Sequence, residues 1–177
     1  AHYTPGDWVT MASGSYSNNS NTPPRDAAFA RYEMGWIEPE EITHRSGGVN
    51  SLPNLGSSNK AYRVSVPGKD NEYFLLENRQ KTGWDAYLPG QGMLIWHIDD
   101  VPEVWQKNEV NNNAAHQHVD IIEANGKLSG YQYYQTGVPF PGANNVTSHK
   151  FKAWDKTELL TIENITETDG VVSFIVA

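Results

Sequence analysis

The stretch HQHVD brings three metal-ligating side chains close together in the sequence. His116, His118 and Asp120 alternate along it, so on a β-strand all three side chains would lie on one face, at steps of about 7 Å. Imidazole and carboxylate groups bind divalent metals, but this spacing converges on one ion only if the strand bends or other residues contribute. The spacing favours a solvated strand face, with a metal site as the alternative.

Another histidine, His97, ends the apolar run MLIWHIDD. Both faces of this run are apolar, which is typical of a central strand covered on both sides. A histidine in such a strand usually gives its ring N–H to a carboxylate or carbonyl. Glu77 and Arg79 close the apolar run FLLENRQ and could lie beside His97 if the two strands pair. We therefore expect a mutually satisfied structural cluster of Glu77, Arg79 and His97, rather than a calcium or catalytic site.

The sequence contains no complete catalytic motif. None of its six histidines begins H-E-x-x-H, the helical pattern in which two histidines bind zinc and the glutamate activates water. The nucleophile elbow G-x-S-x-G and a phosphate-binding glycine loop are also missing. There are no cysteines to act as nucleophiles, metal ligands or disulfide partners. The motifs alone therefore predict no catalytic residue.

The composition argues against nucleic acid and membranes as partners. The formal net charge is −8, and lysines and arginines do not cluster, so nothing attracts phosphate backbones or anionic lipid. No apolar stretch approaches the roughly 20 residues that span a bilayer, and no signal-peptide pattern opens the chain. The chain opens on Ala1 rather than methionine, which predicts a processed or excised chain.

The elements that would position these side chains are mainly β-strands. One helix is expected near residues 26–34, because proline precedes it and Gly35 provides a stop. Residues 46–59 are predicted to be a surface connection, and residues 132–154 to be a long ordered loop. Runs of β-branched and aromatic residues, most of them bounded by turn residues, predict strands at 60–66, 72–80, 92–99, 118–124, 158–166 and 170–177.

These elements predict a mainly β fold, with antiparallel or mixed twisted sheets packed like a sandwich and α+β character at the N-terminal end. A chain of 177 residues can bury a core of its own. We expect residues 1–45 to form a loop and the helix, and residues 46–177 to form the β-rich part, packed together as one continuous domain.

The longest distinctive stretch is ENRQ-x-x-G-W-D-x-x-L-P-G-x-G-M-L-I-W-H, at residues 77–97. Before it come GDWVTMASGSYSNN, TPP and ARYEMGWIEP, and after it come VDIIEANG, FPG and ENITETDGVVSF. In this order the motifs resemble the immune inhibitor A family of secreted bacterial zinc metallopeptidases, from Gly6 nearly to the end of the chain. In that family the zinc helix, H-E-x-x-H-x-x-G-x-x-D, lies shortly upstream of GDW-x-x-M. The resemblance implies that this chain follows the zinc helix and lacks the first half of the catalytic domain.

The resemblance also implies roles for residues of the first loop. Met11 would form the methionine turn, an apolar floor beneath the zinc histidines that does not itself bind the metal. Trp8 and Gly14 would shape this turn, the glycine because the turn needs a backbone conformation that is costly for other residues. Tyr16 would either border the cleft and stabilise an oxyanion, or serve as a packing residue. His97 is not implied as a zinc ligand.

The implied full-length protein is a secreted or cell-surface bacterial endopeptidase that hydrolyses proteins or peptides through a zinc-bound water. Zinc is expected in that full-length protein only, and this chain is expected to be inactive alone. Calcium is a further candidate, from the Asp and Asn content, without a regular calcium-binding loop. Two alternatives remain open: a non-catalytic β-sandwich module that binds glycan or peptide through exposed aromatic rings, and a structural domain of a degenerate protease.

Overall fold

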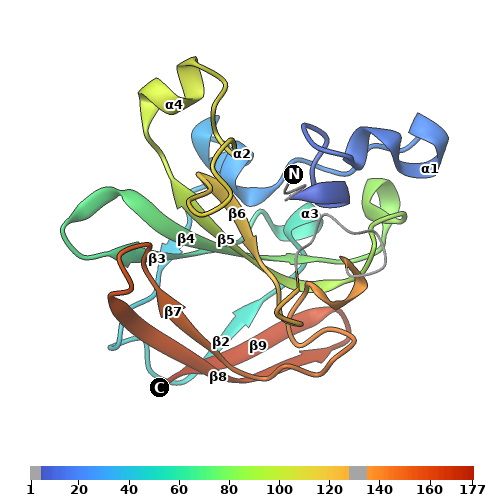
Figure 1. The fold of residues 1–177 in the computed structure, drawn as a ribbon. Coiled ribbons are helices and arrows are strands. Elements are labelled where there is room, and N and C mark those ends of the chain that lie inside the picture. The colour runs from blue at the N-terminus through green and yellow to red at the C-terminus, as the bar shows by residue number, and fades with distance from the viewer. Residues whose placement is uncertain (1–4, 128–134) are drawn as a thin grey trace.

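Two β-sheets pack face to face in the computed structural model, which describes residues 5–127 and 135–177 (Figure 1). In spatial order, the strands of the five-stranded sheet are β1 (Glu40–Glu41), β3 (Tyr62–Val66), β4 (Lys69–Arg79), β5 (Gly92–Asp99) and β6 (Val119–Ile122). Those of the four-stranded sheet are β2 (Val49–Leu52), β9 (Val171–Val176), β8 (Glu158–Thr168) and β7 (His149–Lys152). Every pairing is antiparallel except that of β1 with β3. The predicted mainly β, sandwich-like architecture is confirmed.

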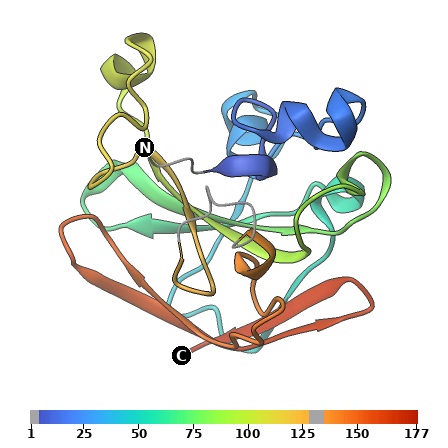
Figure 2. The ribbon, with the colours of Figure 1, turned by 45° about the vertical axis from the view of Figure 1, so that its right-hand side comes forward.

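The N-terminal segment, residues 5–37, covers the outer face of the five-stranded sheet, which is the face turned away from the four-stranded sheet (Figure 2). The predicted helix near residues 26–34 is confirmed as α2, which ends before Gly35 with its φ of +70°. Among the helices in the described part of the chain, none is long and apolar enough to cross a bilayer. The helices are α1 (Ser17–Ser20), α2 (Ala28–Glu33), α3 (Leu55–Ser58) and α4 (Pro102–Gln106), with 3₁₀ turns at Gly6–Trp8, Gly14–Tyr16, Gly83–Asp85 and Gln135–Gly137.

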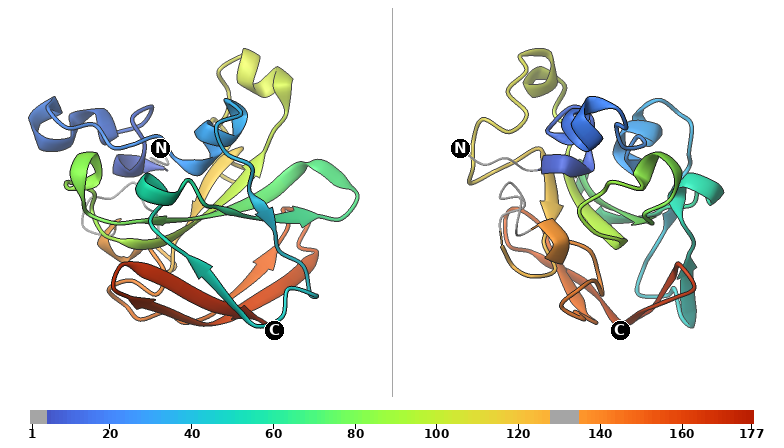
Figure 3. Two further views of the ribbon diagram at one scale, coloured as in Figure 1. Left: turned by 180° about the vertical axis from the view of Figure 1, so that it is seen from behind. Right: turned by 90° about the vertical axis from the view of Figure 1, so that its right-hand side faces the viewer.

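The five-stranded sheet has a hydrophobic core on each face, because side chains alternate along its strands. All eight residues of β5 are buried, as expected for a central strand. Seen from the side, the N-terminal segment, the five-stranded sheet and the four-stranded sheet lie in successive layers (Figure 3). The core between the sheets includes Phe74, Met93, Ile95, Phe151, Ile162 and Phe174, and the core under the N-terminal segment includes Trp8, Ala28, Leu75, Leu94, Trp96 and Ile121.

The six predicted strands are confirmed, with ends that shift by a few residues, but two predicted connections contain further strands. Residues 46–59 are not a simple surface connection, because they include β2 and α3. Residues 132–154 are not a loop throughout, because β7 lies at their end. In each of these short strands a single side chain, Leu52 in β2 and Phe151 in β7, is buried. One buried residue gives no alternating pattern from which a strand could be predicted.

Candidate functional site

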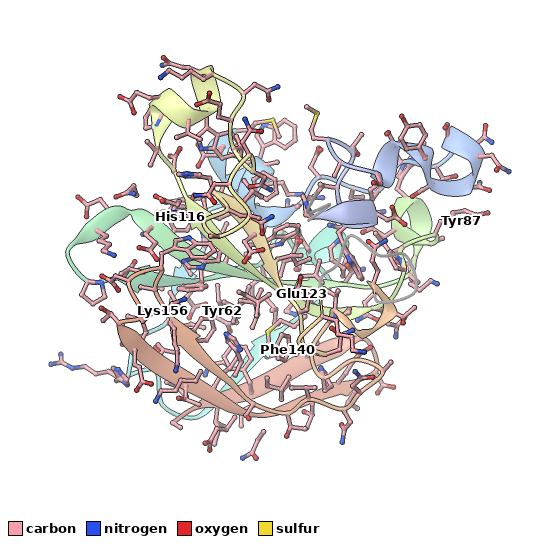
Figure 4. The ribbon with its side chains drawn as sticks, viewed as in Figure 1. Tyr62, Tyr87, His116, Glu123, Phe140 and Lys156 are labelled. Atoms are coloured by element: carbon pink, nitrogen blue, oxygen red, sulfur yellow. The ribbon has the colours of Figure 1, made fainter. Side chains whose placement is uncertain are left out.

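Asp99, His116 and His118 meet at the open end of the β5–β6 pair. Asp99 is the last residue of β5, and its backbone N–H donates to the carbonyl of His118 at 2.9 Å. Its Oδ2 lies 2.6 Å from Nε2 of His116 and 3.5 Å from Nδ1 of His118. Within residues 5–127 and 135–177, this is the one group of three or more such side chains close enough to share a metal ion. His116 is labelled in Figure 4, on the side of the molecule where α4 lies.

The sequence-based candidates are therefore corrected in one position, because Asp99 and not Asp120 joins the two histidines. Asp120 lies two residues further along β6 than His118, about 7 Å away, and is paired in register with His97. Burial raises the pKa of Asp120 to about 7, with a smaller contribution from the charge of Glu123. The sequence carried a signal for Asp99: if the predicted strands 92–99 and 118–124 pair antiparallel, the end of WHID meets the start of HVD.

A column of stacked rings leads from this cluster into the core between the sheets. The ring of His116 stacks on Trp154 at 4.6 Å, and Trp154 stacks on His97 at 4.7 Å, measured between ring centres. His97 in turn stacks on Phe74 at 4.1 Å. The plane of His116 is thus fixed by packing, although 39% of its side chain is exposed. Trp154, which lies just after β7, had no predicted role.

His97 is a buried structural residue, and its partner is Glu72. Nε2 of His97 lies 2.9 Å from Oε1 of Glu72, which also accepts the backbone N–H of Trp154 at 2.7 Å. Burial opposes the charge on Glu72, but the hydrogen bonds from Trp154, His97 and Lys69 outweigh it and lower the pKa of Glu72. Burial lowers the pKa of His97, and the carboxylate of Glu72 only partly opposes this shift. His97 is therefore neutral near pH 7, with its Nε2–H donated to Glu72.

The expected cluster of Glu77, Arg79 and His97 does not form as one unit. Glu77 and Arg79 point to the face of the sheet that the N-terminal segment covers, where the neighbouring Trp96 donates its indole N–H to Oε1 of Glu77 at 2.8 Å. His97 points to the other face, because successive side chains of a strand alternate. The two strands do pair, but in a register that places Phe74, not Glu77, opposite His97.

Glu77 and Arg79 instead belong to a buried network with Asp85. Arg79 binds both carboxylate oxygens of Asp85, at 2.6 and 3.1 Å. The same three side chains hold the backbone that enters α2: Glu77 accepts the N–H of Ala28, Asp85 accepts the N–H of Arg25, and Arg79 donates to the carbonyl of Arg25, each at 2.9 Å. This network, which we call the α2 clamp, fixes the N-terminal segment to the sheet.

The loop that precedes α2 combines a buried anchor with an exposed methionine. Trp8 is completely buried, whereas Met11 is 96% exposed. Gly14 has no left-handed backbone, so the reason expected for it is wrong. A Cβ there would lie 2.6 Å from the carbonyl oxygen of Val9 and 2.8 Å from Cγ of Pro24, so a close approach of the chain requires glycine. Met11, with its side chain 96% exposed, does not fill the interior formed by the described residues.

Two depressions flank this loop. One is an apolar groove of about 430 Å³ between the loop, α2 and the chain around α4, with Val9, Met11, Phe29, Trp105 and Val119 among its lining residues. The other is polar, and Tyr16 lies in its wall with Asp7, Asn19, Tyr87 and Gln135. Tyr16 is 75% exposed, so it does not pack into an interior formed by the described residues.

Comparison with known proteins adds no assignment to this geometry, since the sequence matches no family model and no curated protein.

Proposed function

We propose that this chain is the part of a secreted bacterial zinc metalloendopeptidase, of the immune inhibitor A type, that follows the zinc helix. In this proposal the Trp8–Tyr16 loop forms the floor and flank of the catalytic cleft. The family resemblance motivates the proposal. The observation that carries it is that an anchored loop turns Met11 outward, beside an apolar groove.

The α2 clamp supports a positioning role for this segment. Removing charged side chains from water is unfavourable unless their partners are held in good geometry. Glu77, Arg79 and Asp85 are almost completely buried, and their hydrogen bonds converge on the backbone of Arg25 and Ala28. The clamp thus holds the approach to α2, and with it the preceding loop, in a fixed place on the sheet. A catalytic cleft requires such precision of the residues that border it.

The exposed surface beside Met11 is what a missing partner element would cover. Large apolar side chains in a groove are unfavourable in water, and such patches commonly mark contact surfaces. We assign this surface to the zinc helix of the full-length protein, with Met11 beneath its histidines. Zinc bound there would polarise the substrate carbonyl and activate water. In this proposal the hydroxyl of Tyr16, which lines the neighbouring polar depression, would donate a hydrogen bond to a substrate oxygen.

Two measurements test this function. The coding sequence a short distance upstream of Ala1 should encode H-E-x-x-H, and a start codon in place of that motif would contradict the proposal. The full-length protein should hydrolyse casein, and a chelator should abolish this activity. The 177-residue chain alone, supplied with zinc, should leave casein intact. Chelator-sensitive hydrolysis by the 177-residue chain would assign the chemistry to residues within it and overturn the proposal.

One observation favours the alternative of a binding module. Tyr16 and Tyr87 are both exposed and line the same polar depression, and aromatic rings beside polar groups suit the faces of sugars. A glycan or peptide that binds to the 177-residue chain, and whose binding is lost in Tyr87→Ala, would support this alternative. The absence of upstream H-E-x-x-H together with such binding would select it over the peptidase.

A further inference from the structure

We propose that Asp99, His116 and His118 form a binding site for one divalent transition metal ion of the zinc class. This site is separate from the zinc helix in the proposed function and does not depend on it. Two imidazoles and one carboxylate form a donor set that binds zinc and its neighbours in the first transition series. Oδ2 of Asp99 is the centre of the set, at 2.6 Å from Nε2 of His116 and 3.5 Å from Nδ1 of His118.

Each of the three donors is held in place by a group outside the set. Asn71 donates its side-chain N–H to Oδ1 of Asp99, which leaves Oδ2 facing the histidines. The stack on Trp154 fixes the ring plane of His116. Such outer contacts orient metal ligands and strengthen binding, so the cluster is prepared for a metal before the metal arrives.

The backbone of His118 is held by Asn111. The side-chain oxygen of Asn111 accepts the backbone N–H groups of His118 and Val119, both at 3.1 Å. This double contact fixes the point at which the loop after α4 enters β6. His118 therefore faces Asp99 through strand pairing and through the Asn111 bracket together.

Metal binding must replace two hydrogen bonds that the donors make among themselves. Nε2 of His116 is hydrogen-bonded to Oδ2 of Asp99, and Nδ1 of His118 lies 2.8 Å from the backbone carbonyl of Asp99. An ion bound between these side chains would take the place of the N–H protons in these two hydrogen bonds. The same arrangement without a metal is a hydrogen-bonded Asp–His pair, and the experiment below separates the two.

The site is open to solvent on one side. His116 and His118 line a depression of about 400 Å³ with Val104, Glu109, Asn112 and Asn113. An ion can therefore enter from water, and three protein ligands leave a coordination position for a water molecule. Bound there, the metal would join the end of β5 to the loop between α4 and β6. The bound ion would thus hold this loop against the end of β5 and stabilise it.

Titration calorimetry of the chelator-treated 177-residue chain with zinc chloride tests the site. We expect one zinc ion per chain, with binding lost in His116→Gln and in His118→Gln. His44→Gln is the matched control, because His44 is exposed and lies outside the cluster, and it should bind zinc as the unchanged chain does. Asn71→Ala keeps all three donors and should weaken binding by about 10- to 100-fold.

Cobalt(II) gives a second readout, because its visible absorption reports the ligands that surround it. Absorption typical of four-coordinate cobalt should appear with the unchanged chain and with His44→Gln, and be absent in His116→Gln. Thermal unfolding in chelator shows whether each variant still folds. Failure of the unchanged chain to bind zinc or cobalt would overturn the proposal and leave a hydrogen-bonded Asp–His pair. Equal binding by folded His116→Gln and His118→Gln chains would overturn it as well.

Discussion

Trp96 donates its indole N–H to a carboxylate oxygen of Glu77 at 2.8 Å, and both side chains are completely buried. This contact joins the central strand β5 to the α2 clamp. Glu77 also accepts the N–H of Ala28 and lies 3.5 Å from Arg79, so its removal would leave a buried guanidinium with one counter-charge fewer.

Replacing Glu77 by alanine should therefore destabilise the chain strongly. Breaking a buried ion pair by removing one partner costs about 3–5 kcal/mol. Urea unfolding followed by tryptophan fluorescence measures the change in free energy. Glu103→Ala, at an exposed acid in α4, is the control and should change it by less than about 0.5 kcal/mol. Equal stability of the Glu77→Ala and Glu103→Ala chains would contradict the clamp.

The close approach at Gly14 predicts a different loss of stability. Gly14→Ala would place a Cβ against the backbone of Val9 and the ring of Pro24, and such overpacking costs about 1–3 kcal/mol. Gly47→Ala is the matched control, since nothing lies within 4 Å of a Cβ there and its φ is not left-handed. Chemical denaturation should separate the two variants. A Gly14→Ala chain as stable as Gly47→Ala would show that the loop does not need glycine.

Met11 should respond differently in the short chain and in the full-length protein. In the 177-residue chain, Met11→Ser should leave the melting temperature unchanged, because the side chain is 96% exposed. In the full-length protein, the same change should lower the zinc content or the melting temperature, because in the proposed peptidase Met11 would be covered by the zinc helix. Metal analysis and calorimetry measure both. Unchanged values in the full-length protein would remove the assignment of Met11 to a methionine turn.

His149 gives a pH dependence whose sign follows from its environment. Burial, with the charge of His97 in second place, lowers the pKa of His149 from 6.5 to about 4. Between these pH values the unfolded chain binds more protons than the folded one. The contribution of His149 to the free energy of unfolding is therefore fully present above pH 6.5 and is lost as the pH falls toward 4. The contribution is up to roughly 3 kcal/mol.

Urea unfolding at several pH values tests this dependence. His149→Leu should flatten the fall in stability between pH 6.5 and 4, leaving the part due to His97, whose pKa is also lowered by burial. His44→Leu should leave the slope unchanged, because His44 is exposed. A slope that is the same in both variants would show that His149 is not the titrating group.

The long strands and α2 could be predicted because each carries its own local signals: runs of β-branched and aromatic residues for the strands, and a preceding proline and Gly35 for α2. The short strands could not, because β2 and β7 each bury a single side chain and depend on strands far away in the sequence. Tertiary pairing, rather than local preference, makes these segments extended.

The two histidines of the candidate site were predicted from the sequence, but its aspartate was not. His116 and His118 are neighbours in the sequence and were identified together, whereas Asp99 joins them through the pairing of β5 with β6. His97 lies on the opposite face of the sheet from Glu77 and Arg79, because side chains alternate along a strand and the register of β4 with β5 pairs His97 with Phe74. A prediction that two strands pair does not give their register, and a shift of one residue moves every side chain to the opposite face.

The position of β2 has a consequence for synthesis of the chain. Leu52 in β2 pairs with Val172 in β9, so the second sheet joins segments made early and late by the ribosome. Contacts so distant in sequence form slowly. The apolar face of the first sheet, which includes Phe74 and Ile95, therefore stays partly uncovered until β9 has been made, and apolar surface exposed during that interval favours aggregation.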